Sequence, residues 1–302
     1  MKIALSILVL ALVSVFSAPA QVITVQVLLE QDQFLPGESL PVTVRVINNS
    51  GQSLHLGEAA NWLTFNVESA DNNSVVMKNA DPPVVGGFDL GSSEVATKRV
   101  DLTPYFALTH AGRYHLVATV RIPEWGSAET SPAKEFDVID GAQLWSQDFG
   151  LPVPAGVTNQ LPVVRKYILE EANYLRKQLR MYVLVSDQSG TRILKVSAIG
   201  PMVSFSRPEA QLDRASSLHV LYHSGAQSFI YSVVNPDGNI ALQEIYDYLG
   251  TRPRLAVSGD GGIAVQGGVR RPKPGEYPVV RLPDELPPPP PAPAPAPAPA
   301  KK

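Results

Sequence analysis

The sequence predicts an all-β protein made of two β-rich modules. Apolar and polar residues alternate in short runs through the first half, which is typical of half-buried strands. Clusters of Gly, Pro, Asn and Asp separate these runs, as expected where hairpins turn. The 302 residues include 44% hydrophobic residues and no cysteine. Such a chain is long enough to bury two cores without disulfide bonds.

The first twenty residues have the three parts of a secretory signal. Lys2 precedes an apolar run from Ile3 to Phe16, and Ala18-Pro19-Ala20 provides the small residues of a cleavage site. The run is shorter than the roughly 20 residues that a membrane-spanning helix needs. We therefore expect residues 1–20 to be a signal peptide that is cleaved after Ala20, with the protein exported to the periplasm or the cell surface. The alternative is an uncleaved membrane anchor.

The first module is expected over residues 21–140 as an antiparallel β-sandwich. About seven short strands separated by turn residues are typical of that architecture. The strand candidates are Val22–Leu29, Leu40–Ile47, Trp62–Glu68, Val75–Lys78, Lys98–Leu102, Arg113–Ile122 and Ala133–Ile139.

Two segments of this module resemble bacterial immunoglobulin-like sandwiches. FLPGESL at residues 34–40, running into VTVRVINN at residues 42–49, is similar to the opening of such modules. AGRYHLVA at residues 111–118 is similar to their Gly-x-Tyr-x-Leu strand. The resemblance implies an immunoglobulin-like fold, with Tyr114 making a corner-type hydrogen bond, and a role as stalk, spacer or ligand platform. A fold alone does not fix a function.

A Pro- and Gly-rich linker is expected over residues 141–162, followed by the second module over residues 163–271. Residues 163–181 are predicted to be a helix that leads this module. Its apolar residues fall near helical spacing at Val164, Ile168, Ala172, Leu175 and Leu179. We expect the helix to pack on a sheet, and a membrane-surface or partner-docking helix is the alternative.

The remainder of the second module contains a repeated pattern. Residues 182–195 and 230–243 both predict a hairpin with an Asp- and Gly-containing turn, and the pairs Arg207-Pro208 and Arg252-Pro253 lie 45 residues apart. This period suits a four-stranded propeller blade, and the layout resembles the repeats of bacterial propeller proteins. Since too few repeats are present to close a ring, we expect a compact pair of sheets. The alternative is that several chains combine.

Residues 272–302 are expected to be a disordered, Pro/Ala-rich tail. Pro287–Pro291 is followed by alternating Ala and Pro and by Lys301-Lys302. Proline fixes φ and lacks an N–H, so residues 287–300 predict an extended polyproline II spacer of roughly 43 Å. It resembles the spacers of bacterial envelope proteins that cross the periplasm. A tail without a partner and a spacer that contacts membrane or cell wall both remain open.

No pattern in the sequence supports catalysis, a metal site or a cofactor. The chain has no nucleophile elbow, P-loop or HExxH motif. His219 and His223 lie four residues apart in a predicted strand, roughly 13 Å, which is too far for both to bind one zinc ion. The net charge of −3 also provides no basic footprint for nucleic acid.

Three aspartates could in principle serve a hydrolase. Asp187, Asp237 and Asp260 each lie in a glycine-containing turn. Asp caps such turns and Gly adopts the positive φ that they need, so the residues are expected to be structural.

Aromatic residues are the better candidates for binding. Trp125, in a loop after a strand, and Tyr222, Tyr231 and Tyr246, along the repeat region, could contact a sugar or a peptide. Packing within the sheets is the alternative. The sequence therefore predicts an exported, non-enzymatic scaffold or binding protein of the cell envelope that recognises a protein or a glycan. Its oligomeric state is left open. A glycan-binding module and a hydrolase with turn carboxylates are the alternative functions.

Overall fold

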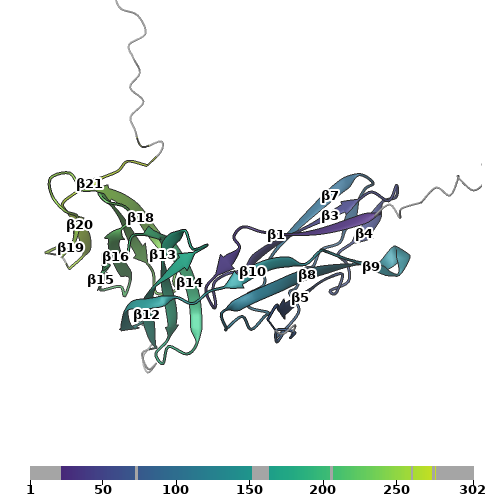
Figure 1. Cartoon of the computed structure of the whole chain (residues 1–302), viewed down its shortest axis with the longest axis horizontal. Helices are drawn as coiled ribbons and strands as arrows, with labels where there is room; N and C mark the ends of the chain where they lie inside the picture. Colours follow the sequence, from purple (N-terminus) through teal and green to yellow (C-terminus); the bar gives the residue numbers. More distant parts are fainter. Residues whose placement is uncertain are drawn as a thin grey trace, which may run out of the picture.

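The computed structural model describes residues 22–71, 74–151, 163–204, 207–259, 261–273 and 276. The predicted signal peptide and nearly all of the predicted tail lie outside these residues. The described chain is almost entirely β-structure in several antiparallel sheets, as the sequence predicts. Figure 1 shows two β-bodies side by side along the long axis, the first coloured from purple to teal and the second from teal-green to yellow.

The first body is a sandwich of two sheets. One sheet contains β1 (Ile23–Leu29), β3 (Pro41–Asn48) and β7 (Glu94–Asp101) in that spatial order. The facing sheet contains β2 (Gln33–Phe34), β10 (Lys134–Val138), β8 (Gly112–Ile122) and β5 (Leu63–Ser69), with β9 (Ser127–Thr130) beside β8. The strands β4 (Leu54–Leu56) and β6 (Phe88–Leu90) pair with each other.

Strict alternation along the strands builds the core of this sandwich. In β3 every second residue is buried, from Val42 through Val44 and Val46 to Asn48. The same period holds in β8, where Tyr114, Leu116, Ala118 and Val120 point inward. The predicted strand at residues 75–78 is wrong, because Val75 and Lys78 make only isolated bridges.

The second body also contains two sheets that pack face to face. The first has the order β11 (Ala142–Gly150), β12 (Val164–Tyr174), β13 (Gln178–Asp187), β14 (Ile193–Met202). The other has the order β15 (Glu209–Leu212), β16 (Leu218–His223), β17 (Ser228–Val234), β18 (Ile240–Asp247), β21 (Val269–Arg270). A ribbon of β19 (Arg254–Val257) and β20 (Ile263–Gln266) shares a buried cluster with the outer face of the second sheet.

The predicted helix over residues 163–181 is wrong. These residues form β12, a turn and the start of β13, paired antiparallel from Arg165↔Asp187 to Tyr174↔Gln178. The reason is that the sheet is buried on both faces, so its strands need apolar residues at successive positions. Tyr167 and Leu169 face the second sheet, whereas Ile168 belongs to a cluster on the opposite face. Because the apolar residues of this segment do not alternate with polar ones, their spacing resembles the period of a helix.

The predicted linker is shorter than expected. Residues 142–150 form the edge strand β11, which pairs with β12 from Ala142↔Glu171 to Gly150↔Val164. Residues 152–162 lie outside the described residues. The chain therefore crosses between the sandwiches at residues 139–141, directly after β10.

The two predicted hairpins form, and each lies in a different sheet. They are β13–β14 and β17–β18. Gly190 and Gly238 occupy equivalent turn positions with φ of 81° and 82°, where a side chain would be strained. The hairpins meet across the sandwich, because Ser197 Oγ donates to Gly238 O at 2.8 Å.

The turn between β12 and β13 carries backbone strain. Leu175 and Arg176 have φ of 51° and 55°, and Lys177 N–H donates to Tyr174 O at 3.1 Å. Positive φ at both central positions favours Asn-Gly, and an ordinary residue costs about 1–2 kcal/mol there. The variant Leu175→Asn/Arg176→Gly is therefore expected to raise the free energy of unfolding in urea by about 1–2 kcal/mol. Arg176→Ala, which removes the side chain but keeps the strain, is the control, and an equal gain in it would contradict the explanation.

Candidate functional site

An apolar joint connects the two sandwiches. Leu35, which follows β2, is 2% exposed and packs on the outer face of the sheet that contains β12 and β13. The buried residues that it joins there are Ile168, Ala172, Tyr182, Leu184 and Val196, with Ile139 and Ile193 partly buried beside them. Leu35 is thus a side chain of the first sandwich that completes the packing of the second.

Polar contacts surround this apolar joint. The N–H of Leu175, in the strained turn, donates to Gln33 Oε1. Arg180 Nη1 donates to Gln31 Oε1 at 3.5 Å, and its guanidinium lies 3.5 Å from the centre of the Tyr174 ring. The strained turn and strand β13 are therefore both hydrogen-bonded to the first sandwich.

Glu38 places a carboxylate at the joint. Its Oε2 accepts the Leu35 N–H at 2.8 Å and its Oε1 accepts from Gln31 Nε2 at 2.9 Å. Burial raises the pKa of Glu38, and the hydrogen bonds and the nearby Arg180 offset part of that rise. Burial also raises the pKa of Tyr182 to about 12, with a further contribution from the charge of Glu38. Burial at the joint thus disfavours the charged form of the Glu38 side chain.

The raised pKa of Glu38 predicts that the stability of the protein depends on pH. The folded state binds the Glu38 proton more tightly than the unfolded chain, so stability falls as the pH rises from about 4.5 through the raised pKa. Glu38→Gln is expected to be more stable than the wild type above that window and equal to it below. Melting temperatures at pH 4 and pH 8 test this, with the exposed Glu30→Gln as control. An equal pH difference in both variants would count against the assignment.

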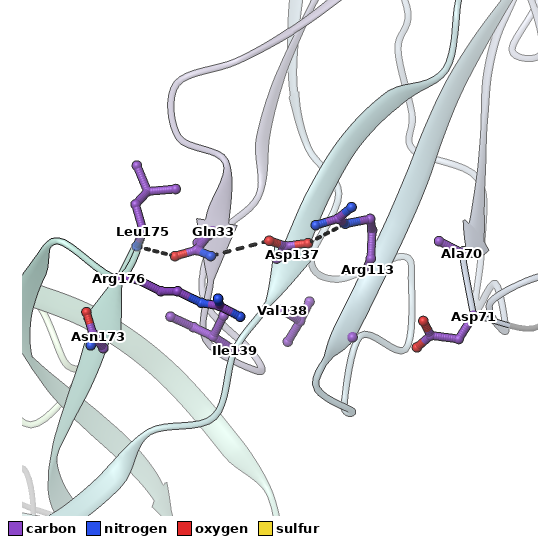
Figure 2. Close-up of a pocket in the computed structure, with 11 residues that line it drawn as sticks. Gln33, Ala70, Asp71, Arg113, Asp137, Val138, Ile139, Asn173, Leu175 and Arg176 are labelled. Carbon is purple, nitrogen blue, oxygen red and sulfur yellow. Dashed lines mark hydrogen bonds and ion pairs between the residues drawn. The ribbon is translucent and has the colours of Figure 1, made fainter.

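A groove of about 1020 Å³ opens beside the joint. Figure 2 shows a chain of interactions along it, from Leu175 through Gln33 and Asp137 to Arg113. Gln33 Nε2 donates to Asp137 Oδ2 at 3.3 Å, and Arg113 Nε donates to Asp137 Oδ1 at 3.1 Å. The hydrogen bond to Asp137 raises the pKa of the Arg113 guanidinium.

Polar and charged side chains from both sandwiches line this groove. Asp71 and Arg113 come from the first, and Asn173 and Arg176 from the second (Figure 2). Hydrogen bonds and charge can hold a polar ligand here. Among the described lining residues, no nucleophile lies beside a general base.

The structure does not bring the predicted binding aromatics together. Tyr222 is 1% exposed, its ring lies in the core between the two sheets, and its hydroxyl donates to Ile199 O. Tyr231 is buried beneath the ribbon, with its hydroxyl 2.7 Å from His219 Nδ1. Their burial favours the alternative of packing within the sheets, because this sheet is covered on both sides.

The other two predicted aromatics lie apart from each other. Tyr246 is half-buried, packs edge-on against the Tyr231 ring and donates to Glu244 at 3.1 Å. Trp125 ends a short 3₁₀ turn (Pro123–Trp125) in the first sandwich and is 36% exposed. Of the four candidates, Trp125 is the most exposed.

The histidines and aspartates considered above make contacts within the fold. His219 Nε2 is 3.2 Å from Asp213 Oδ2, and the His223 ring packs on Phe229 with ring centres 3.9 Å apart. Asp187 accepts hydrogen bonds within its own turn, which lower its pKa. Asp237 pairs with Arg165 at 2.9 Å, and Asp260 lies outside the described residues. In the described residues no group of three or more His, Cys, Asp or Glu side chains is placed to hold a metal ion.

Sequence reasoning missed the joint and its groove. Leu35 precedes Pro36-Gly37, and an apolar residue at a turn was the one available signal that it is covered by another part of the chain. Gln33 ends a short polar stretch and Asp137 lies between the apolar residues Phe136 and Val138 of a strand, and neither pattern carries a motif.

Comparison with known proteins gives little. No family model and no curated protein matches the chain. Six solved chains match, and among them is the sporulation control protein Spo0M of Bacillus subtilis. It is 14% identical, with 70% of this chain and 79% of that chain covered and a TM-score of 0.30.

Proposed function

We propose that this chain is an exported, non-enzymatic scaffold or binding protein of the cell envelope that presents two β-sandwiches in one fixed orientation. The observation that supports the fixed orientation is the insertion of Leu35 into the second sandwich. If only a flexible linker connected the two modules, the surfaces that face each other would be polar and exposed to solvent.

The energy of the joint supports a fixed orientation. Separating the sandwiches would expose the outer face of β12 and β13, including Ile168 and Leu184. Burying one leucine side chain is worth about 1.5–3 kcal/mol, and the cluster contains several comparable groups. A groove that takes charged residues from both sandwiches needs this fixed geometry, because its two walls belong to different modules.

We also propose the finer identity of each module. An immunoglobulin-like first sandwich is supported by Tyr114, whose hydroxyl donates to His110 O at 2.8 Å, the corner bond that the resemblance implies. An internal repeat in the second body is supported by the matching turns at Gly190 and Gly238.

Export rests on the sequence of residues 1–20, with the Pro/Ala-rich tail as an extension toward membrane or cell wall. None of the described residues belongs to a helix of sufficient length and apolarity to cross a membrane. A glycan-binding role through Tyr222 and Tyr231 is weakened by their burial. A hydrolase would need carboxylates other than Asp187 and Asp237, which serve turns and an ion pair.

Affinity capture from the native cell envelope tests the proposal. The baits are the wild-type chain, Leu35→Asp at the joint, and Leu28→Asp at a residue that is 44% exposed on the first sandwich. We expect a stoichiometric partner on the wild type and on Leu28→Asp, with at least about tenfold less on Leu35→Asp. The absence of a partner on the wild-type bait would argue against a role for the joint. A partner that all three baits capture equally would argue against it as well.

A further inference from the structure

Strand β15 has an unpaired edge. It ends the five-stranded sheet, and it pairs only with β16 among the described strands. Asp213 N–H donates to Ser217 O at 3.0 Å, which sets the hydrogen-bonding order of the hairpin. Alternate residues of an antiparallel strand direct their N–H and C=O groups to the same side. The main-chain groups of Gln211 therefore face β16, and those of Ala210 and Leu212 face away from it.

A groove of about 400 Å³ runs along this free edge. Gln147 of β11 lines one side, and Val257 and Ile263 of the ribbon line the other. Ala210 and Leu212 are partly exposed within it. The free main-chain groups thus lie in a recess with apolar side chains on one wall.

Two polar groups in the groove lack a partner among the described residues. Gln211 Oε1 is buried and accepts no hydrogen bond there. Buried polar atoms are rarely unsatisfied, so each such atom needs an explanation. The Arg214 guanidinium lies against Gly261, 2.6 Å from where a Cβ would stand, and forms no ion pair within the described chain. The exposed Arg214 guanidinium is therefore a cation that a ligand in the groove can reach.

The β15 edge also lacks the charged side chains that usually protect an edge strand from pairing with another chain. β7, an edge of the first sandwich, carries Glu94, Lys98, Arg99 and Asp101. Such charges prevent the pairing of a further strand. β15 carries only Glu209, and its carboxylate accepts the Leu255 N–H at 2.8 Å.

We propose that this groove binds an extended, acidic segment of a partner polypeptide, which adds to β15 as a further strand. Only a main chain in extended conformation presents N–H and C=O groups at the spacing that matches Ala210 and Leu212. Its alternate side chains would contact Val257 and Ile263, and an acidic side chain would reach Arg214. This inference adds a partner class to the proposed binding role, but it stands on β15 and not on the joint.

A second copy of this chain fits the groove poorly. β15 lies between β11 and the ribbon. In a second copy, β11 and the ribbon would therefore prevent its β15 from reaching this groove. An unfolded segment of a different protein has no such walls. The β15 edge is only four residues long, so the complex should be weak and short-lived.

A display selection with random nine-residue peptides on the purified chain tests this proposal. Ala210→Pro removes an outward N–H without breaking a bond to β16, and Arg214→Glu reverses the exposed charge. Thr97→Pro is the matched control, because Leu102 N–H donates to Leu40 O at 3.0 Å and so directs the Thr97 N–H away from β3. Circular dichroism establishes that each variant is folded.

We expect enriched acidic peptides with alternating apolar residues that bind the wild type and Thr97→Pro alike. Binding should weaken at least about tenfold in Arg214→Glu and in Ala210→Pro. Should Ala210→Pro not fold, Arg214→Glu decides alone. No enriched peptide, or equal binding to Arg214→Glu, would overturn the proposal. A wild-type dimer in sedimentation that Ala210→Pro abolishes would overturn the choice of partner. None of these results bears on the joint, which is tested separately.

Discussion

Leu35→Asp is expected to uncouple the two sandwiches. The wild-type side chain is 2% exposed and packs among Ile168, Tyr182 and Val196 of the second sandwich. Loss of a buried leucine costs about 2–5 kcal/mol, and a buried unpaired carboxylate adds to that cost. Because Leu35 lies outside the core of the first sandwich, the loss falls on the joint and on the second body.

Differential scanning calorimetry measures this uncoupling. We expect one cooperative transition for the wild type and two for Leu35→Asp, with one of them lowered by at least several degrees. Leu28→Asp makes the same chemical change on an exposed strand position and should keep a single transition. Two transitions in the wild type, or one unchanged transition in Leu35→Asp, would show that the joint does not couple the sandwiches.

Tyr222→Ala is expected to produce the largest loss within the second sandwich. The ring is fully buried between the two sheets, and truncation of a large buried aromatic side chain costs about 3–5 kcal/mol. Tyr222→Phe keeps the ring and removes only the hydroxyl, which donates to Ile199 O. Since Gln243 Nε2 also donates to that oxygen at 2.7 Å, the loss in Tyr222→Phe should be about 1 kcal/mol.

Urea unfolding of the two variants distinguishes packing from ligand binding. A role in packing predicts a large loss in Tyr222→Ala and a small one in Tyr222→Phe. Equal stability of Tyr222→Ala and the wild type, together with lost ligand binding, would restore Tyr222 as a binding residue.

The sequence predicted the first sandwich better than the second for a physical reason. β3 and β8 have one face in the core and one toward solvent, so alternation reveals them directly. β12 and β13 are covered on both sides, by the second sheet and by Leu35. Their apolar residues follow no two-residue period, and the prediction of a helix at residues 163–181 arose from that loss of alternation.

The candidate sites depend on contacts that no single segment encodes. Tyr222 and Tyr231 were predicted as binding residues from their recurrence, but recurrence in a repeat also arises when each copy fills a core. Their burial depends on the facing sheet and on the ribbon β19–β20, which are separate in sequence. The joint likewise brings Leu35 to residues more than a hundred positions away, and neither segment carries a motif for it.

A distance measurement between the sandwiches tests the central claim most directly. The chain contains no cysteine, so spin labels can be placed at Thr97→Cys and Ala241→Cys, two exposed positions in different sandwiches. A fixed joint predicts one narrow distance distribution by pulsed electron spin resonance, which broadens when Leu35→Asp is added. A broad distribution in the labelled wild type, unchanged by Leu35→Asp, would contradict the proposal that the chain presents two sandwiches in one orientation.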